Sequence, residues 1–214
     1  MEQEETLFVV IEGIDGCGKD TQIDMVVEKL ENFTTLRNIS SYPLGKGIRG
    51  MIGSDDKLVN KFMHNHMGVA HMYIGELFFV QEQVKEALVN NNVICSRWHY
   101  STMAYIGDSQ DVIDFIGNSG KHLLKPHIVI RLRIDVETSL ERIKSRNENL
   151  EFFETKERLE ATHKRYDKLN GLYGNYGTHN IYNINVDNLS REEVHEKIKE
   201  VINNYRSFIY GVVQ

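Results

Sequence analysis

One segment, residues 7 to 30, restricts the fold of this chain more than any other. The stretch from Leu7 to Ile11 is apolar throughout, which is typical of a strand buried on both faces of a parallel sheet. Glycines follow at once. Between Thr21 and Leu30 apolar residues recur at spacings of three and four, which predicts a helix. The segment therefore predicts a strand, a glycine-rich turn and a helix in direct succession.

The same alternation recurs further along the chain. The sequence predicts further strands at Val93 to Cys95, His127 to Ile134 and Ile181 to Ile184. It predicts further helices at Val69 to Asn90, Val136 to Ser145, Glu154 to Leu169 and Ser190 to Tyr205. The last helix has a clear start signal, because Ser190 is followed three residues later by Glu193. This alternation indicates an α/β fold with an open parallel sheet of about five strands flanked by helices.

Composition favours a single globular domain over residues 1–214. Hydrophobic residues make up 41% of the chain and charged residues 26%, which is enough apolar material for a buried core. No linker rich in Pro, Gly or Ser divides the 214 residues.

Charge and hydropathy exclude several partners. The formal net charge of −6 argues against a nucleic-acid polymer as ligand, because such binding depends on neutralising many phosphates. The longest apolar runs are far shorter than the ~18 residues that a membrane span needs, and the acidic start is unlike a signal peptide. We therefore expect a cytoplasmic protein that makes no membrane contact and binds small molecules.

The glycine-rich turn carries a phosphate-binding motif. Residues 13–21 read Gly-Ile-Asp-Gly-Cys-Gly-Lys-Asp-Thr, with Gly and Gly-Lys at the spacing of a P-loop. Glycines allow consecutive backbone N–H groups to turn toward phosphate oxygens, and the helix N-terminus adds partial positive charge. We expect ATP to bind across the whole loop, with Lys19 on the transferred phosphate. The loop residues are Gly13, Ile14, Asp15, Gly16, Cys17, Gly18, Lys19, Asp20 and Thr21.

One position departs from the motif. The residue after the lysine is normally Ser or Thr, whose hydroxyl binds Mg²⁺, but here it is Asp20. A carboxylate at this place is repelled by phosphate unless a cation lies between them. The metal site is therefore either rebuilt or lost.

With its flanking residues, this loop resembles the thymidylate kinase family of P-loop nucleoside-monophosphate kinases. Residues 8–22 are similar to that family's F-x-x-x-E-G-x-D-G-x-G-K-S-T-Q, and residues 96–105 to its D-R-Y-x-x-S-x-x-A-Y. Weaker similarity extends over nearly the whole chain. The resemblance implies the P-loop kinase fold with a short lid at about residues 142–154.

The resemblance also implies roles for individual residues. Lys19 and the loop amides would hold the ATP phosphates, Asp15 would contact the acceptor nucleotide, and Arg97 would lie between the two phosphates. Ser101 and Tyr105 fall in the family's acceptor positions. Alternatively, Arg97 is a surface arginine paired with a carboxylate, and Tyr105 is an ordinary core residue.

Family members without an arginine in the P-loop place catalytic arginines in the lid. Arg142 and Arg146 stand four residues apart on the helix that leads into the predicted lid, so they would share one helix face. Either they close over ATP together, or they form a solvated basic face.

Several acceptor positions depart from the family pattern. The base-stacking phenylalanine and the arginine after it align with Met72 and Glu76. The segment from Tyr42 to Arg49 resembles the loop that binds the acceptor phosphate but lacks its usual arginine, for which Lys46 or Arg49 would substitute. These changes point to the base pocket as the divergent part of the site.

A second metal-linked change is Ser96, where the family has Asp. Together, Asp20 and Ser96 retain one carboxylate and one hydroxyl at the two positions that face the metal, with their places exchanged. We take this exchange as a hypothesis for the Mg²⁺ site.

The function implied by the resemblance is transfer of the γ-phosphate of ATP to a deoxynucleoside monophosphate, with dTMP as leading acceptor, dTDP as product and Mg²⁺ as cofactor. It also implies a homodimer formed partly through the long helix that begins near Val69. Two alternatives stay open. One is a kinase of the same fold for another or modified pyrimidine deoxynucleotide, and the other is a nucleotide-binding relative without catalysis.

Overall fold

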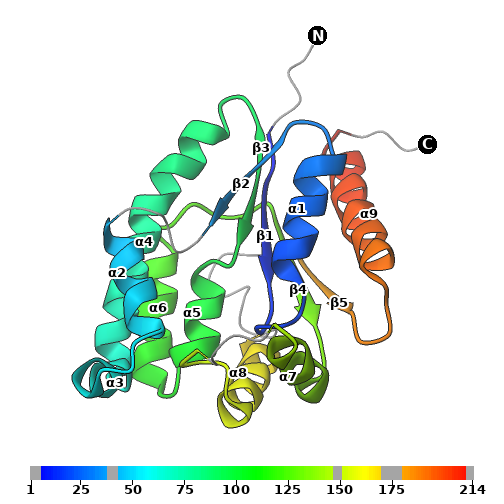
Figure 1. Ribbon diagram of the computed structural model, residues 1–214. Coiled ribbons are helices and arrows are strands. Elements are labelled where there is room, and N and C mark those ends of the chain that lie inside the picture. The colour runs from blue at the N-terminus through cyan, green and yellow to red at the C-terminus, as the bar shows by residue number, and fades with distance from the viewer. Residues whose placement is uncertain (1–5, 38–42, 147–150, 170–179, 211–214) are drawn as a thin grey trace.

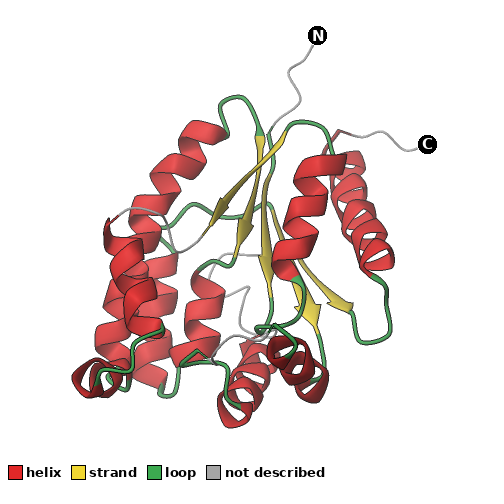
Figure 2. Ribbon diagram, in the orientation of Figure 1, coloured by secondary structure: helices red, strands yellow, loops and turns green. Residues whose placement is uncertain are grey.

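The computed structural model describes residues 6–37, 43–146, 151–169 and 180–210. Its five strands form one sheet, in the order β2-β3-β1-β4-β5. Their bounds are β1 Phe8–Glu12, β2 Phe33–Arg37, β3 Asn92–Ser96, β4 Ile128–Arg133 and β5 Ile181–Asn185. All four pairings are parallel, and Figure 2 shows the five arrows running the same way. The predicted open parallel sheet of about five strands is confirmed.

The helices of the described ranges cover both faces of this sheet. α1 and α9 contact each other on one side, whereas α4, α5 and α6 contact one another on the other side (Figure 1). The helices are α1 Lys19–Lys29, α2 Pro43–Ile52, α3 Lys57–Met63, α4 His66–Ala87, α5 His99–Ile106, α6 Gln110–Gly120, α7 Val136–Lys144, α8 Lys156–Leu169 and α9 Arg191–Tyr210.

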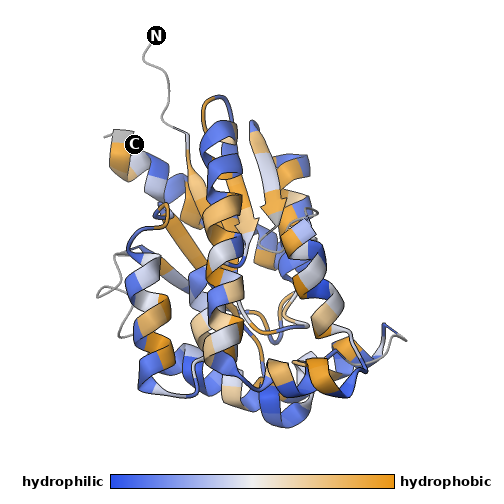
Figure 3. Cartoon of the chain, turned by 90° about the vertical axis from the view of Figure 1, so that its left-hand side faces the viewer, coloured by the Kyte–Doolittle hydropathy of each residue, from blue (hydrophilic) through white to orange (hydrophobic). Residues whose placement is uncertain are grey.

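The central strand explains why the sheet forms. All five residues of β1 are buried, because helices cover both of its faces. In Figure 3 the strands are mostly hydrophobic, while the helices alternate between the two colours. The rings of Phe8 on β1 and Trp98 pack in a T-shaped arrangement at 5.2 Å between centroids, which holds the residues after β3 against the central strand.

The chain diverges at the carboxyl ends of β1 and β3. After β1 it crosses to β2 at one edge of the sheet, and after β3 it crosses to β4 on the other side of β1. Such a switch point leaves a crevice beyond the strand ends, which is where ligands bind in open α/β sheets. Two loops meet there: the glycine-rich loop after β1, and the turn at Arg97 after β3.

The capping box predicted for the last helix is confirmed. The Ser190 hydroxyl accepts from the Glu193 N–H at 3.2 Å, and the Glu193 carboxylate accepts from the Ser190 N–H at 2.8 Å. These two bonds satisfy amide donors that the helix itself cannot use. The remaining predicted strands and helices are present, with ends displaced by a few residues.

Three regions differ from the sequence interpretation. β2 carries two threonines among its five residues and was not predicted as a strand. The segment Pro43–Arg49, expected as a loop, lies in the helix α2, where Ile48 and Ile52 are buried one turn apart although three glycines weaken the helical signal. The segment between the predicted strands that end at Cys95 and begin at His127, for which no helix was predicted, contains α5 and α6. Tyr42 lies outside the described residues, as do residues 147–150 of the predicted lid.

No helix in the described part of the chain is both long enough and apolar enough to cross a bilayer.

Candidate functional site

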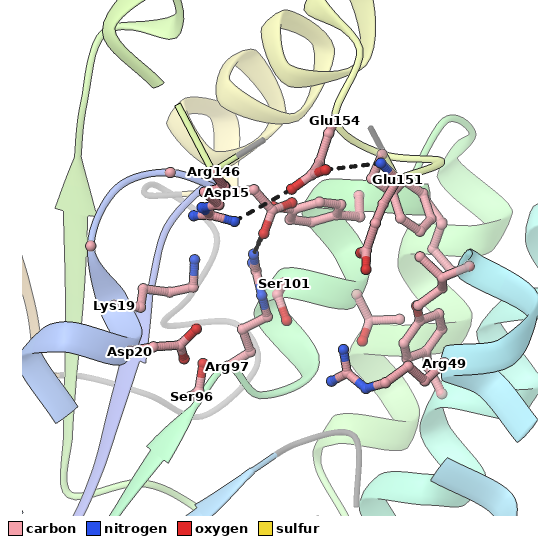
Figure 4. A pocket seen from close by; sticks show the side chains of 18 of the residues that line it. Asp15, Lys19, Asp20, Arg49, Ser96, Arg97, Ser101, Arg146, Glu151 and Glu154 are labelled. Atoms are coloured by element: carbon pink, nitrogen blue, oxygen red, sulfur yellow. Dashed lines mark hydrogen bonds and ion pairs between the residues drawn. The ribbon is translucent and has the colours of Figure 1, made fainter. Parts of the chain in front are cut away.

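A cavity of about 310 Å³ lies at the switch point, between the glycine-rich loop, the turn after β3 and the segment before α8 (Figure 4). Its lining combines charged side chains with aromatic and aliphatic ones. The lining residues are Asp15, Gly16, Gly18, Lys19, Asp20, Thr21, Arg49, Ile52, Tyr73, Ser96, Arg97, Ser101, Thr102, Tyr105, Ile106, Arg146, Glu151, Phe153 and Glu154.

The glycine-rich loop has the backbone that its glycines predict. Gly13, Gly16 and Gly18 have φ of +144°, +77° and +93°, values that residues other than glycine rarely adopt. At Gly16 an added Cβ would lie 2.6 Å from the backbone oxygen of Ser139 on α7, so this glycine also allows a close approach. The Ser139 hydroxyl donates to the Asp15 carbonyl at 2.6 Å and fixes the loop against α7.

Lys19 lies inside the loop rather than in solvent. It is 7% exposed, and its amine donates to the Ile14 carbonyl at 2.9 Å. The same amine lies 3.7 Å from the Cys17 sulfur. The loop thus holds a positive charge beside its own curved backbone. Gly13, Ile14 and Cys17 belong to the loop, but they do not line the cavity.

Arg97 is the most firmly held cation of the site. Its φ is +70°, an uncommon value that turns the side chain from the end of β3 toward the loop. The guanidinium donates to the Gly13 carbonyl at 2.8 Å, to the Asp15 carboxylate at 2.6 Å and to the Tyr105 hydroxyl at 2.8 Å. The Tyr105 hydroxyl in turn donates to the other Asp15 oxygen at 2.8 Å.

The charges of this cluster reinforce one another. Burial alone would raise the pKa of Asp15, but the charges of Arg97 and Lys19 and the hydrogen bonds from Tyr105 and Arg97 hold that pKa below its usual range. Burial opposes the charge of Arg97, yet interactions with Tyr105 and Asp15 raise its pKa well above the usual value. Asp15 is therefore an anion and Arg97 a cation over the physiological pH range.

Glu12, at the end of β1, holds the segments around this cluster together through hydrogen bonds. Its side chain accepts a hydrogen bond from the Trp98 N–H at 2.7 Å and from the Tyr166 hydroxyl at 2.8 Å. Burial raises the pKa of Glu12 against the lowering effects of Arg97 and of these bonds. Glu12 ties the end of β1 to the turn after β3 and to α8. In the sequence Glu12 stands out only as part of a motif, and its signal is a carboxylate at the end of an apolar strand.

Asp20 and Ser96 lie on the same side of the cavity, below Lys19 in the view of Figure 4. Asp20 is exposed in the first turn of α1, and Ser96 ends β3 opposite Ile11 of β1. Within the described ranges, neither the Asp20 carboxylate nor the Ser96 hydroxyl hydrogen-bonds to another side chain. The two side chains therefore supply one carboxylate and one hydroxyl to the cavity wall.

The predicted lid arginines separate in the structure. Arg146 lines the cavity from the turn after α7, and its guanidinium lies 3.6 Å from the Glu154 carboxylate. Glu154 also accepts from the Glu151 N–H at 2.9 Å, so the two described sides of the predicted lid are connected. Arg142, in the last turn of α7, does not line the cavity, and the pair does not converge on it.

The acceptor candidates also divide into two groups. Arg49, Ser101 and Tyr105 line the cavity, together with Asp15 and Arg97. Lys46, Met72 and Glu76 do not, and Glu76 is fully buried within α4.

Several lining residues were not predicted from the sequence. Tyr73 comes from α4, one residue from Met72, and Ile52 ends α2. The rings of Phe153 and Tyr105 pack in a T-shaped arrangement at 5.3 Å between centroids. Thr102 is 5% exposed, and its hydroxyl has no hydrogen-bond partner in the described part of the chain. Thr102 follows Ser101 within the motif at residues 96–105, at a position that the motif leaves open. Tyr73, Ile52 and Phe153 reach the cavity only through tertiary packing.

The fold and the site together define a class. A phosphate-binding loop after the central strand, an arginine turn after its neighbour and a cavity lined by both characterise P-loop nucleoside-monophosphate kinases. The family model described as thymidylate kinase matches residues 11–198. The chain belongs to the thymidylate kinase family.

Relatives over nearly the full length agree with this assignment. A probable thymidylate kinase of Methanocaldococcus jannaschii is 31% identical over 200 residues, covering 94% of this chain and 97% of the relative. One of Methanococcus aeolicus is 30% identical over 191 residues, covering 89% and 93%. The solved thymidylate kinase of Candida albicans has a TM-score of 0.75 at 21% identity, covering 94% of each chain, and this likeness supports the fold.

Proposed function

We propose that this protein transfers the γ-phosphate of ATP to dTMP, giving ADP and dTDP. The main support for this proposal is that Lys19 of the phosphate loop, Arg97 and several aromatic side chains line one cavity. A chain of this family with that arrangement has a place for a donor, a place for an acceptor and a fixed cation between them.

The donor end is formed by the loop and α1. Amide groups of the loop and the N-terminus of α1 attract phosphate oxygens, and Lys19 leaves the Ile14 carbonyl to bind the transferred phosphate. Arg146, which now pairs with Glu154, would bind the same phosphates after this pair opens. Phosphoryl transfer needs little covalent chemistry from the protein, so these fixed positive charges supply the main catalytic effect.

Arg97 would act between donor and acceptor. Its guanidinium is oriented in advance by Gly13, Asp15 and Tyr105, so little reorganisation is needed when charge develops on the transferred group. Asp15 keeps the arginine charged and in place.

The acceptor end lies between α2, α4, α5 and the residues before α8. Arg49 provides a cation for the acceptor phosphate, as one of the two candidates from the sequence. Phe153 and Tyr73 offer aromatic faces or edges to a base, and the hydroxyls of Thr102 and Ser101 offer polar contacts. Because Met72 and Glu76 lie outside the cavity, we assign base recognition to these residues instead.

Mg²⁺ fits the donor end. Asp20 and Ser96 present carboxylate and hydroxyl oxygens, which are the hard ligands that Mg²⁺ prefers. Within the described ranges no three His, Cys, Asp or Glu side chains form a metal-binding group, so nucleotide phosphates and water would complete the coordination. When bound, the metal supplies neutralisation of phosphate charge.

Location and assembly are proposed with the function. A nucleotide kinase of this kind would work in the cytoplasm, where its nucleotides are. Phe78 and Phe79 on α4 are 37% and 46% exposed, which supports this helix as part of a homodimer interface. Light scattering after size-exclusion chromatography tests the dimer, and a monomer at micromolar concentration would contradict it.

The direct test is an assay of ADP formation with ATP, Mg²⁺ and each common deoxynucleoside monophosphate. We expect dTMP to give the highest kcat/KM. Arg97→Lys should lower kcat about 100-fold, because lysine keeps the charge but loses the planar array of donors. Arg191→Lys, at an arginine whose side chain is 72% exposed at the start of α9, is the matched control and should retain activity.

Absence of dTMP-dependent ADP formation would overturn the proposal. If ATP then still bound, the non-catalytic alternative would hold. Faster turnover of another monophosphate would instead select the second alternative, a kinase of the same fold with a different acceptor.

A further inference from the structure

Asp20 presents a carboxylate at the place where phosphate must bind. It follows Lys19 directly, lies in the first turn of α1 and lines the cavity. In the described part of the chain no cation forms an ion pair with it. Two negative groups a few ångströms apart repel each other strongly at the surface of a protein. A bare polyphosphate in this loop would therefore meet an opposing charge.

The fold tolerates this carboxylate well before any nucleotide binds. An acidic residue in the first turn of a helix is stabilised by the positive end of the helix dipole. Asp20 is also exposed, so water solvates its charge. The conflict arises only when phosphate occupies the same helix terminus, because both anions then compete for the same amide groups.

Ser96 lies where a second oxygen ligand is available. It ends β3, pairs in register with Ile11 of β1 and lines the same cavity as Asp20. Figure 4 shows Ser96 and Asp20 on the same side of the cavity. A carboxylate oxygen stands one bond further from the backbone than a hydroxyl oxygen. An aspartate on α1 with a serine on β3 therefore has the same combined side-chain length as a serine on α1 with an aspartate on β3. Both arrangements can hold a metal ion between the two elements.

We infer that Asp20 and Ser96 form an exchanged ligand pair for the donor's Mg²⁺, and that Asp20 makes nucleotide binding depend on the metal. This inference rests on the proposed function only in taking ATP as the donor. With Mg²⁺ present, the carboxylate becomes a ligand and strengthens binding. Without Mg²⁺, the same carboxylate repels the phosphates. The enzyme thereby selects metal-bound nucleotide over free nucleotide.

The test measures the dissociation constant of ADP by calorimetry, with excess Mg²⁺ and with EDTA, on the full-length protein. The ratio of the EDTA value to the Mg²⁺ value gives the coupling. In Asp20→Asn, ADP should bind roughly tenfold tighter in EDTA and roughly tenfold weaker in Mg²⁺, so the ratio falls about 100-fold. In Ser96→Ala, the dissociation constant of ADP should stay constant in EDTA and rise in Mg²⁺.

Asp24→Asn is the matched control. It makes the same chemical change one turn further along α1, at an exposed residue away from the cavity, and should leave the ratio unchanged. The reciprocal variant Asp20→Ser with Ser96→Asp should restore the ratio to within about threefold of the original, whereas Asp20→Ser alone should not. Far-UV circular dichroism checks that each variant is folded.

Two results would overturn the inference. One is a ratio in Asp20→Asn equal to that in Asp24→Asn, and the other is a double exchange that binds Mg-ADP no better than Asp20→Ser. These outcomes do not depend on the acceptor. An enzyme active on dTMP with no Asp20-dependent coupling refutes this inference alone. Coupling without dTMP-dependent turnover refutes the proposed function alone.

Discussion

At the scale of single residues, the site is organised by groups that restrain one another. Asp15, Arg97 and Tyr105 each contact the other two, so no one of them can move without breaking two hydrogen bonds. Such a network fixes the cation before substrate arrives, which is what electrostatic catalysis requires.

Removal of the Tyr105 hydroxyl tests this arrangement. In Tyr105→Phe, Asp15 loses a donor and Arg97 loses an acceptor, while the ring still packs against Phe153. We expect kcat/KM for dTMP to fall about tenfold and the free energy of unfolding to drop by about 1 kcal/mol. Steady-state kinetics and urea unfolding measure these effects. Tyr182→Phe on β5, away from the cavity, is the control, and an equal loss in both variants would contradict the expectation.

His99 gives a second prediction at this scale. Its ring is 2% exposed, and neither ring nitrogen has a hydrogen-bond partner in the described part of the chain. Burial lowers the pKa of His99 from 6.5 to about 3. In the unfolded chain His99 therefore binds a proton below about pH 6.5, whereas in the folded chain it binds that proton only below about pH 3.

Stability should consequently fall as the pH drops, with His99 contributing a loss of about 2 kcal/mol between pH 7 and pH 5. The stabilising contribution of neutral His99 is fully present above the pKa of the unfolded chain, and it is lost as the pH falls toward the pKa of the folded chain. His99→Leu cannot bind the proton, so its curve of unfolding free energy against pH should be flatter over this range. Parallel curves for the two proteins would show that His99 is not the source.

The residues predicted from the sequence are those in local motifs. Arg97 directly follows β3, and Asp15 and Lys19 belong to the glycine-rich loop that follows β1, so their spacing from a buried strand places all three near the carboxyl ends of the strands. Tyr73 and Phe153 reach the same cavity from α4 and from the segment before α8, so only the packing of distant segments reveals them. For the same reason the sequence could not separate Arg146, which lines the cavity, from Arg142, which does not.

At the scale of elements, the strongest signals gave the most reliable predictions. The apolar strand β1 and the capping box of α9 depend on local chemistry, and both are present. α2 was missed because its glycines resemble a loop, although burial of Ile48 and Ile52 stabilises a helix there. β2 lacks a periodic pattern, and its pairing with β3 decides its conformation.

The contact between the phosphate loop and α7 gives a prediction for two glycines. Gly18→Ala places a methyl group in open space, so only the strain of φ +93° acts against it, about 1–2 kcal/mol. In Gly16→Ala the strain of φ +77° is joined by a steric clash, because the new Cβ would lie 2.6 Å from the Ser139 backbone oxygen. We expect the free energy of unfolding to fall by about 3 kcal/mol or more. Urea unfolding without nucleotide measures both, and equal losses would show that the α7 contact yields easily.

At the scale of the whole molecule, one hydrophobic cluster joins the sheet to its helices. Buried residues of all five strands belong to it, from Phe33 on β2 to Ile184 on β5. Because every strand pairs with strands distant in sequence, no described part of the sheet can form from one local segment. This arrangement favours the single domain expected from the sequence over two units that fold separately.

Cooperative unfolding is the prediction that belongs to this scale. Trp98 is the only tryptophan in the sequence, is fully buried and touches Phe8 of the central strand, so its fluorescence reports the middle of the sheet. Far-UV circular dichroism reports the helices on both faces. If the chain is one cooperative unit, the two signals should give the same midpoint in urea and the same shift to higher urea when Mg²⁺ and ADP are added. A helix signal that persists after Trp98 becomes exposed would mean that the covering helices and the sheet unfold as separate units, since chains of this size can populate such intermediates.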